Sequence, residues 1–143
     1  GDGARLEILH PRQPFLTGGR SDDNENAIAL RLVYGDLRVL FAADIEEFAE
    51  QDLLASGQSL SAQVLKVGHH GSRWSSSQAF LKAVGPQIAI ISCGRDNNFG
   101  HPHKETLARL NGVKIYRTDQ QGAITLESDG KAIVLNTYLK TSL

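Results

Sequence analysis

The sequence predicts a layered α/β domain in which strands and short helices alternate. Two short apolar runs, 62–67 and 88–91, have the length and composition of buried strands. A segment with helical signals follows each run, and pairs of alternating segments separated by turn residues lie near both ends of the chain. Strands that alternate with helices in the middle, with hairpins at the ends, are typical of a mixed sheet covered by helices.

The first third of the chain is predicted to contain one strand, a long loop and a β-hairpin. Gly35 and Asp36 form a two-residue turn in the hairpin, and its second strand is almost entirely apolar, so we expect it in the centre of a sheet. The loop is rich in Gly, Pro, Asp and Asn, and its length is typical of a functional or mobile segment. The predicted bounds are 5–9 for the strand, 11–25 for the loop, and 27–34 and 37–42 for the hairpin.

The remainder is predicted to contain three short helices and five further strands. Three serines at 75–77 are an N-cap signal for the second helix, and Gly85 ends it. Pro102 takes a tolerated first-turn position of the third helix, and Asp-Gly at 129–130 is the stronger turn signal of a C-terminal β-hairpin. The predicted helices are 45–54, 78–84 and 103–110, and the predicted strands are 62–67, 87–92, 113–117, 123–127 and 131–136.

Length and composition indicate one domain of ordinary globular character. The 143 residues are 41% hydrophobic with a formal charge of −1, so any contact with nucleic acid must come from a local basic patch. Cys93 is the only cysteine, which excludes an intrachain disulfide and a cysteine-rich zinc site. No apolar run approaches the roughly 20 residues of a membrane span. The opening segment 1–4 lacks the features of a signal peptide, and we expect it to be an internal boundary of a longer protein.

Asp44 ends the predicted central strand at the entry to the first helix. With Glu47 three residues further on, it has the form of a capping box, in which the aspartate accepts a hydrogen bond from the first helical turn. A carboxylate at the end of a buried strand is also well placed to bind a metal ion. One side chain can do both, so the sequence leaves the two interpretations open.

Four of the five histidines lie in two clusters beside glycines. His69 and His70 stand between Gly68 and Gly71, directly after the strand at 62–67. Adjacent residues of an extended chain point to opposite sides, so both can face one ion only if the backbone turns, which the glycines permit. The alternative is that one histidine packs under the loop and the other is solvated.

The second cluster is His101 and His103. His101 could cap the third helix, and His103 could be a surface residue of its first turn. Imidazole is the commonest side-chain ligand of zinc and also suits manganese. An aspartate with two histidines and an open coordination position is the type of ligand set that hydrolytic metal sites use. The chain has no HExxH, CxxC, GxxxxGK[ST] or GxSxG motif, so these residues indicate a class of chemistry rather than a known motif.

Six segments, taken in order, carry a resemblance to a known family. They are NENA at 24–27, LFAAD at 40–44, VLKVGHHGS at 64–72, ISCG at 91–94, NFGHP at 98–102 and IYRTD at 115–119. Together they resemble the C-terminal half of the metallo-β-lactamase-like domain in ComEC-type DNA-internalisation competence proteins. The resemblance extends from about residue 6 to residue 127, and its most specific parts are the HHGS and GHP segments.

The resemblance implies an αββα sandwich with a metal site at the edge of two sheets. It also implies a metal-dependent nuclease that degrades the DNA strand not carried into the cell. Asp44 resembles the bridging metal ligand, and His69 or His70, together with His101, fall where the family places metal-binding or phosphate-binding groups. Asn24 lies near the position of a histidine ligand in many related enzymes, so that ligand is absent from this chain.

The largest departure from the family is the missing HxHxDH-type cluster of the N-terminal half. We therefore expect residues 1–143 to be a single, partial domain that is inactive alone. The expected partners are the N-terminal half, the backbone of single-stranded DNA, a parent membrane channel domain and a second copy of the chain that covers the exposed internal face. The expected location is a soluble domain of a bacterial inner-membrane protein, on the extracytoplasmic side.

These expectations lead to a hypothesis of phosphodiester hydrolysis with zinc or manganese, with two ions in the complete domain. Asp44 and His70 are the expected catalytic residues, and the expected metal ligands are Asp44, His69, His70 and His101. The expected substrate contacts are Ser72, Arg73, Arg95, His103 and Lys104. Trp74 could also stack on a base. The alternatives are a non-catalytic module of the same fold that binds DNA or a partner, and a metallo-hydrolase with a small-molecule substrate.

Overall fold

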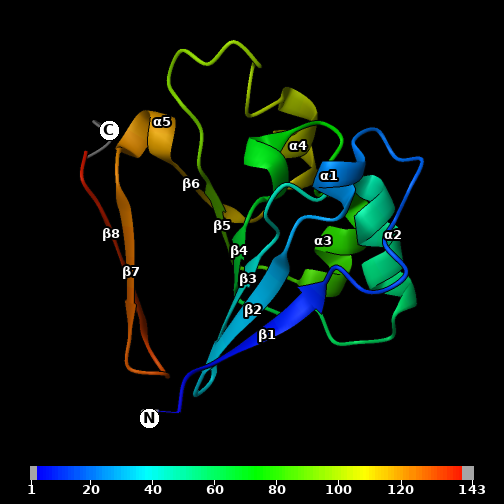
Figure 1. Cartoon of the computed structure of the whole chain (residues 1–143). Helices are drawn as coiled ribbons and strands as arrows, with labels where there is room; N and C mark the ends of the chain where they lie inside the picture. The colour runs from blue at the N-terminus through cyan, green and yellow to red at the C-terminus, as the bar shows by residue number, and fades with distance from the viewer. Residues whose placement is uncertain (1–2, 140–143) are drawn as a thin grey trace.

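The computed structural model describes residues 3–139 as a six-stranded sheet with its longer helices on one face and a separate hairpin on the other (Figure 1). The sheet order follows the chain, β1-β2-β3-β4-β5-β6. The pairs β1–β2 and β2–β3 are antiparallel, and the pairs from β3 to β6 are parallel. The strands are β1 (Arg5–His10), β2 (Ala29–Tyr34), β3 (Leu37–Phe41), β4 (Val64–Lys66), β5 (Ile88–Ile91) and β6 (Lys114–Arg117). This arrangement confirms the mixed α/β class.

The described residues contain five α-helices rather than the three predicted. They are α1 (Asp22–Glu25), α2 (Glu47–Ala55), α3 (Gln78–Val84), α4 (Lys104–Arg109) and α5 (Thr118–Gln121). The first and last are single turns without room for hydrophobic periodicity. Ser21 starts α1, because its hydroxyl accepts a hydrogen bond from the Asn24 N–H at 3.3 Å. Within the described part of the chain, no helix is long or apolar enough to span a membrane.

The third of the predicted helices, α4, begins later than the sequence predicts. His103 is the N-cap residue of α4, so Pro102 precedes the helix instead of occupying its first turn. The second helix agrees with prediction in detail. The Ser77 hydroxyl accepts from the Phe80 N–H at 3.3 Å, and Gly85 ends the helix in the left-handed conformation.

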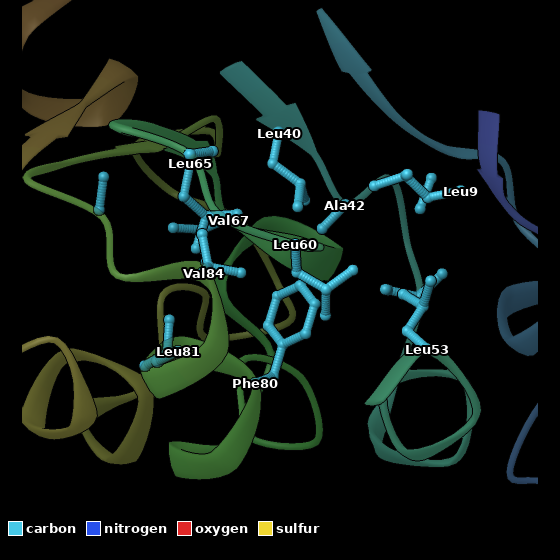
Figure 2. Packing of buried hydrophobic residues seen from close by; sticks show 14 of the residues in the cluster. Leu9, Leu40, Ala42, Leu53, Leu60, Leu65, Val67, Phe80, Leu81 and Val84 are labelled. Carbon is cyan, nitrogen blue, oxygen red and sulfur yellow. The ribbon is translucent and has the colours of Figure 1, made fainter. Parts of the chain in front are cut away.

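Apolar side chains cover both faces of the central strands. Between the sheet and the helices, Leu40 and Leu65 meet Leu53 of α2 and Phe80 of α3, and all four are completely buried (Figure 2). The opposite face carries a smaller cluster of Leu37, Val39 and Val64, against which Leu126 and Ile133 pack. The last two belong to the antiparallel hairpin of β7 (Ile124–Ser128) and β8 (Ile133–Thr137). Because neighbouring residues of a strand point to opposite faces, burial on both sides explains why residues 39–41 of β3 and 64–65 of β4 are apolar without alternation.

The four parallel strands end at one edge of the sheet. Their register aligns Phe41 with Lys66, Lys66 with Ile90, and Ile90 with Tyr116. The loops that follow these strands therefore leave the sheet side by side, at the edge where α/β sheets commonly bind ligands. This edge receives Asp44 after β3, both histidine pairs after β4 and β5, and the turn of α5 after β6.

Candidate metal centre

The first histidine pair sits in a tight turn, η1 (Gly68–Gly71). The turn is made by the histidines themselves, since φ is +42° at His69 and +55° at His70. Residues other than glycine occupy this left-handed region at a cost of about 1–2 kcal/mol each, so the rest of the fold must hold them there. The His69 N–H donates to the Ala43 carbonyl at 2.9 Å, which ties the turn to the end of β3. The sequence correctly anticipated a turn but assigned its conformational freedom to the glycines alone.

A close backbone approach at Gly71 joins the two histidine clusters. Gly71 has φ of +85°, and a Cβ atom built on it would lie 2.6 Å from the Cβ atom of Pro102. The His103 N–H also donates to the Gly71 carbonyl at 2.9 Å. Glycine is therefore needed at this position so that the loop carrying His101 and His103 can lie against the turn.

Asn97 shapes the second loop from within. Its side-chain amide donates to the carbonyls of Gly94 and His101 at 2.8 and 2.7 Å, and its oxygen accepts from the His101 N–H at 2.9 Å. These three bonds close the loop on itself and fix the backbone of His101. The sequence did not predict this role of Asn97, because a polar residue between two glycines is typical of any loop.

The four histidines form one group of rings at the strand exits. The ring centroids of His69 and His101 are 5.5 Å apart, those of His69 and His70 are 6.2 Å apart, and those of His70 and His101 are 6.3 Å apart. His103 joins them with its centroid 4.9 Å from that of His101. The remaining histidine, His10, is buried elsewhere, with Nε2 2.7 Å from the Glu25 carbonyl oxygen.

Hydrogen bonds orient two of the imidazoles with one nitrogen free. Nδ1 of His70 lies 2.7 Å from the carbonyl oxygen of Ser92. A carbonyl only accepts, so Nδ1 carries the proton and the lone pair lies on Nε2. Nδ1 of His69 lies 2.9 Å from Oε1 of Glu46, which leaves Nε2 of His69 free in the same way when the carboxylate is ionised. Histidines that bind metals are commonly held by such bonds from the other ring nitrogen.

Asp44 is not a helix cap. The backbone makes a turn after β3 in which the Ile45 N–H donates to the Ala42 carbonyl at 3.2 Å, and α2 then begins after Glu46. Glu46 is the N-cap residue, and its side chain makes no capping bond. The capping interpretation is therefore wrong. The Asp44 carboxylate instead lies half-exposed with Oδ1 3.7 Å from Nε2 of His70.

The local environment favours the neutral form of His101 by lowering its pKa. Burial lowers the pKa of His101, and the neighbouring His103, His69 and His70 lower it further, whereas Asp44 acts in the opposite direction. A neutral imidazole has the lone pair that a metal ligand needs. Burial also lowers the pKa of Lys66, which stands at the end of β4, although Asp44 opposes this shift.

The expected substrate contacts do not all lie together. Arg73, His103 and Lys104 line one open groove of about 640 Å³ with Phe99 at its edge. The Arg73 N–H donates to Nδ1 of His103 at 3.3 Å, so the His103 proton lies on Nε2, where it can be donated. The other two are placed differently. Ser72 is only 3% exposed, with its hydroxyl accepting from the Trp74 N–H, and Arg95 donates to the Asp119 carbonyl.

The donor set fits a divalent metal in chemical type, but its side chains do not converge on one point. Imidazoles with free nitrogens and an open carboxylate are suitable ligands for zinc or manganese. Over residues 3–139, however, no three His, Cys, Asp or Glu side chains converge closely enough to hold an ion. Asn24, which was expected near an absent histidine ligand, lies in α1 with its N–H bound to Ser21. The described residues therefore provide part of a ligand set.

Comparisons with known proteins find one family and several relatives. The model of the Metallo-beta-lactamase superfamily, whose members generally bind divalent metals, matches residues 22–95. ComE operon protein 3 of Bacillus subtilis (strain 168) is 30% identical over 136 residues, which are 94% of this chain and 17% of that protein. Competence protein ComA of Neisseria gonorrhoeae is 38% identical over 126 residues, 86% of this chain and 18% of that protein. Recombination protein 2 of Haemophilus influenzae (strain ATCC 51907 / DSM 11121 / KW20 / Rd) is 34% identical over 112 residues, 78% of this chain and 14% of that protein. The chain thus spans less than a fifth of each relative.

Proposed function

Because this chain belongs to the metallo-beta-lactamase superfamily, we propose that it is part of a metal-dependent phosphodiesterase that degrades DNA during its uptake. One of its relatives is named a competence protein, one a ComE operon protein and one a recombination protein, and these names support DNA as the substrate. The observation that carries the proposal is the group of four histidines beside Asp44, one of which, His103, lines a groove together with Arg73 and Lys104.

Asp44, His69, His70 and His101 would hold the metal, which we propose to be zinc or manganese and to number two ions in the complete site. Bound metals of this kind lower the pKa of a coordinated water and polarise phosphate oxygens. The protein keeps Nε2 of His70 available through the bond from Nδ1 to Ser92. It also holds Nε2 of His70 3.7 Å from Oδ1 of Asp44, so that both side chains would act on the same phosphate.

The open groove would receive the DNA backbone. Arg73 and Lys104 add positive charge, and His103 can donate a hydrogen bond from Nε2. Contacts of this type recognise phosphates and sugars and carry no sequence preference. We also propose Arg95 and Ser72 as phosphate contacts, although each already has a partner within the protein. Arg95 donates to the Asp119 carbonyl, and the Ser72 hydroxyl accepts from the Trp74 N–H.

The remaining ligands would come from outside these residues, and we propose the N-terminal half of the same domain as their source. Leu6 and Ile8 expose apolar side chains on β1, which lies at the edge of the sheet. Such an edge is suited to continuation by another chain segment. A second copy of the chain is the other proposed occupant. We further propose that the domain belongs to a bacterial inner-membrane channel protein and lies on the extracytoplasmic side.

The test is DNA cleavage by the protein that contains this chain, assayed with Mn²⁺ or Zn²⁺. We expect Asp44→Ala and His70→Ala each to lower cleavage at least 100-fold, because each removes a group that acts on the phosphate. Asp96→Ala is the matched control, since Asp96 is exposed on the neighbouring loop and lies outside the site. Cleavage that survives Asp44→Ala unchanged would show the assignment to be wrong.

A non-catalytic DNA-binding module is the second candidate. It is favoured by the lack of three converging metal ligands within the described range, 3–139. Such a module would bind single-stranded DNA with a steep salt dependence and no metal in the purified protein. Metal analysis of the purified protein separates the two candidates. A small-molecule substrate is a third possibility for the same metal chemistry.

A further inference from the structure

A cleft of about 520 Å³ lies beside the candidate metal centre, and none of the roles above uses it. It opens between the loop at 18–20, the start of α2 and Trp74. Its volume falls within the usual range of small-molecule sites. The lining residues that determine its chemistry are Arg20, Glu25, Glu46, Glu47, Phe48 and Trp74.

Glu46 connects this cleft with the histidines. Its Oε1 atom lies 2.9 Å from Nδ1 of His69. The residue is only 4% exposed, and its Oε2 atom is buried without a hydrogen-bond partner among the residues that the structure describes. A buried carboxylate oxygen without a partner is costly, because it has lost its hydration without replacement. Glu46 also lines the cleft, and because Oε2 is buried, a ligand there would donate the missing hydrogen bond once the carboxylate turns towards it.

The walls of the cleft suit a flat ring. The guanidinium of Arg20 lies over the indole of Trp74, 3.4 Å from its centroid, and Phe48 exposes part of its ring nearby. The Glu47 N–H donates to the Trp74 carbonyl at 2.9 Å, which fixes the tryptophan against the start of α2. Nucleobases stack on aromatic rings and on arginine guanidinium planes alike.

The charges decide which ligand fits. Three glutamates and one arginine line the cleft, so a phosphate is disfavoured and a group that donates hydrogen bonds is favoured. We propose that this cleft binds a nucleobase with an exocyclic amino group, and that the amino group donates to Oε2 of Glu46. This inference rests on the proposed function, since the base would belong to the strand whose backbone lies at the histidines.

Cytosine and uracil provide a sharp test, because they differ at C4 by an amino group or a carbonyl. Binding of oligodeoxycytidine and oligodeoxyuridine of equal length is measured with the full chain by fluorescence anisotropy, in EDTA and at fixed salt. We expect about tenfold tighter binding of oligodeoxycytidine, the size expected for one hydrogen bond to a charged acceptor.

Glu46→Gln tests the oxygen itself. The glutamine can still accept from His69 through Oε1, but it places an amino group where Oε2 was. We expect the preference to disappear or to reverse towards oligodeoxyuridine, whose C4 carbonyl accepts a hydrogen bond. Glu47→Gln removes the same charge from the same cleft and should keep the preference for oligodeoxycytidine. Circular dichroism checks that all three proteins are folded.

Equal binding of the two oligomers by the unaltered chain would overturn this inference and leave the proposed function standing. An unchanged preference in Glu46→Gln would overturn it as well, since the cytosine would then be recognised elsewhere. If the protein that contains this chain neither binds nor cleaves either oligomer with Mn²⁺, the proposed function fails together with the inference.

Discussion

Gly71→Ala should destabilise this protein more than an ordinary change from glycine to alanine. Gly71 has φ of +85°, and an alanine there is strained by about 1–2 kcal/mol. Its new Cβ atom would also lie 2.6 Å from the Cβ atom of Pro102, so one of the two loops must move. Overpacking of this kind costs about 1–3 kcal/mol. We therefore expect the free energy of unfolding to fall by about 2–5 kcal/mol.

Gly57→Ala is the matched control for the backbone strain. Gly57 has φ of +71°, and nothing lies within 4 Å of a Cβ atom built there. We expect a loss of about 1–2 kcal/mol from strain alone. Urea unfolding, followed by circular dichroism and by the fluorescence of the single tryptophan, gives both values. The excess loss in Gly71→Ala measures the contact between the two histidine loops.

Equal losses in the two variants would refute this reasoning. They would mean that the backbone at Gly71 does not approach Pro102 as closely as the structure indicates. The argument that this approach joins the two histidine pairs into one site would then fail. A change in the slope of the urea dependence would point instead to an altered unfolded state, so the slope must be compared as well.

Three further predictions concern groups that are not proposed to bind metal or DNA. Burial raises the pKa of Glu50 above its ordinary value of 4.5. Above about pH 4.5 the folded protein therefore still holds a proton that the unfolded chain has lost, and the free energy of unfolding falls as the pH rises through the folded pKa. We expect Glu50→Gln, which has no such proton to lose, to reduce this decline in unfolding measurements between about pH 4 and 8; parallel pH profiles would contradict the shift. Arg109 donates to three backbone carbonyls, so Arg109→Leu should lower the free energy of unfolding by about 2–4 kcal/mol. The control, Arg38→Leu, removes one exposed hydrogen bond and should change it by less than about 0.5 kcal/mol. Equal effects of the two substitutions would argue against the Arg109 network. Burial raises the pKa of Cys93 from 9.0 to about 11, so the folded chain contains about 100-fold less thiolate at pH 8 than the unfolded chain. Iodoacetamide should therefore label Cys93 about 100-fold faster in urea than in the folded chain at pH 8. Similar labelling rates would disprove the shift.

Local signals in the sequence were sufficient for most of the secondary structure. The serine before α3 and the glycine after it act within one helical turn, and both perform the capping that their sequence predicts. The apolar runs of β4 and β5 identify buried strands because burial on both faces requires apolar residues throughout. The single turns α1 and α5 escaped prediction, since four residues cannot show a helical period.

The residue types of the candidate site were also evident from the sequence. Histidines after β4 and β5, and an aspartate after β3, suggested metal chemistry before any coordinates, because imidazole and carboxylate have few equally suitable roles at strand exits. The sequence could not choose between a cap and an open carboxylate for Asp44. That choice depends on a turn before α2, which is fixed by the contact of Ala43 with His69.

What only the tertiary structure decided is which groups meet and which are left without a partner. The parallel register brings the exits of four strands to one edge, and the approach of Gly71 to Pro102 joins histidine pairs that are distant in sequence. Burial turned Ser72 inward and left one oxygen of Glu46 unpaired, although both residues are ordinary in the sequence. The physical reason is that donor chemistry belongs to a single side chain, whereas convergence, burial and hydrogen-bond partners depend on how separate segments pack together.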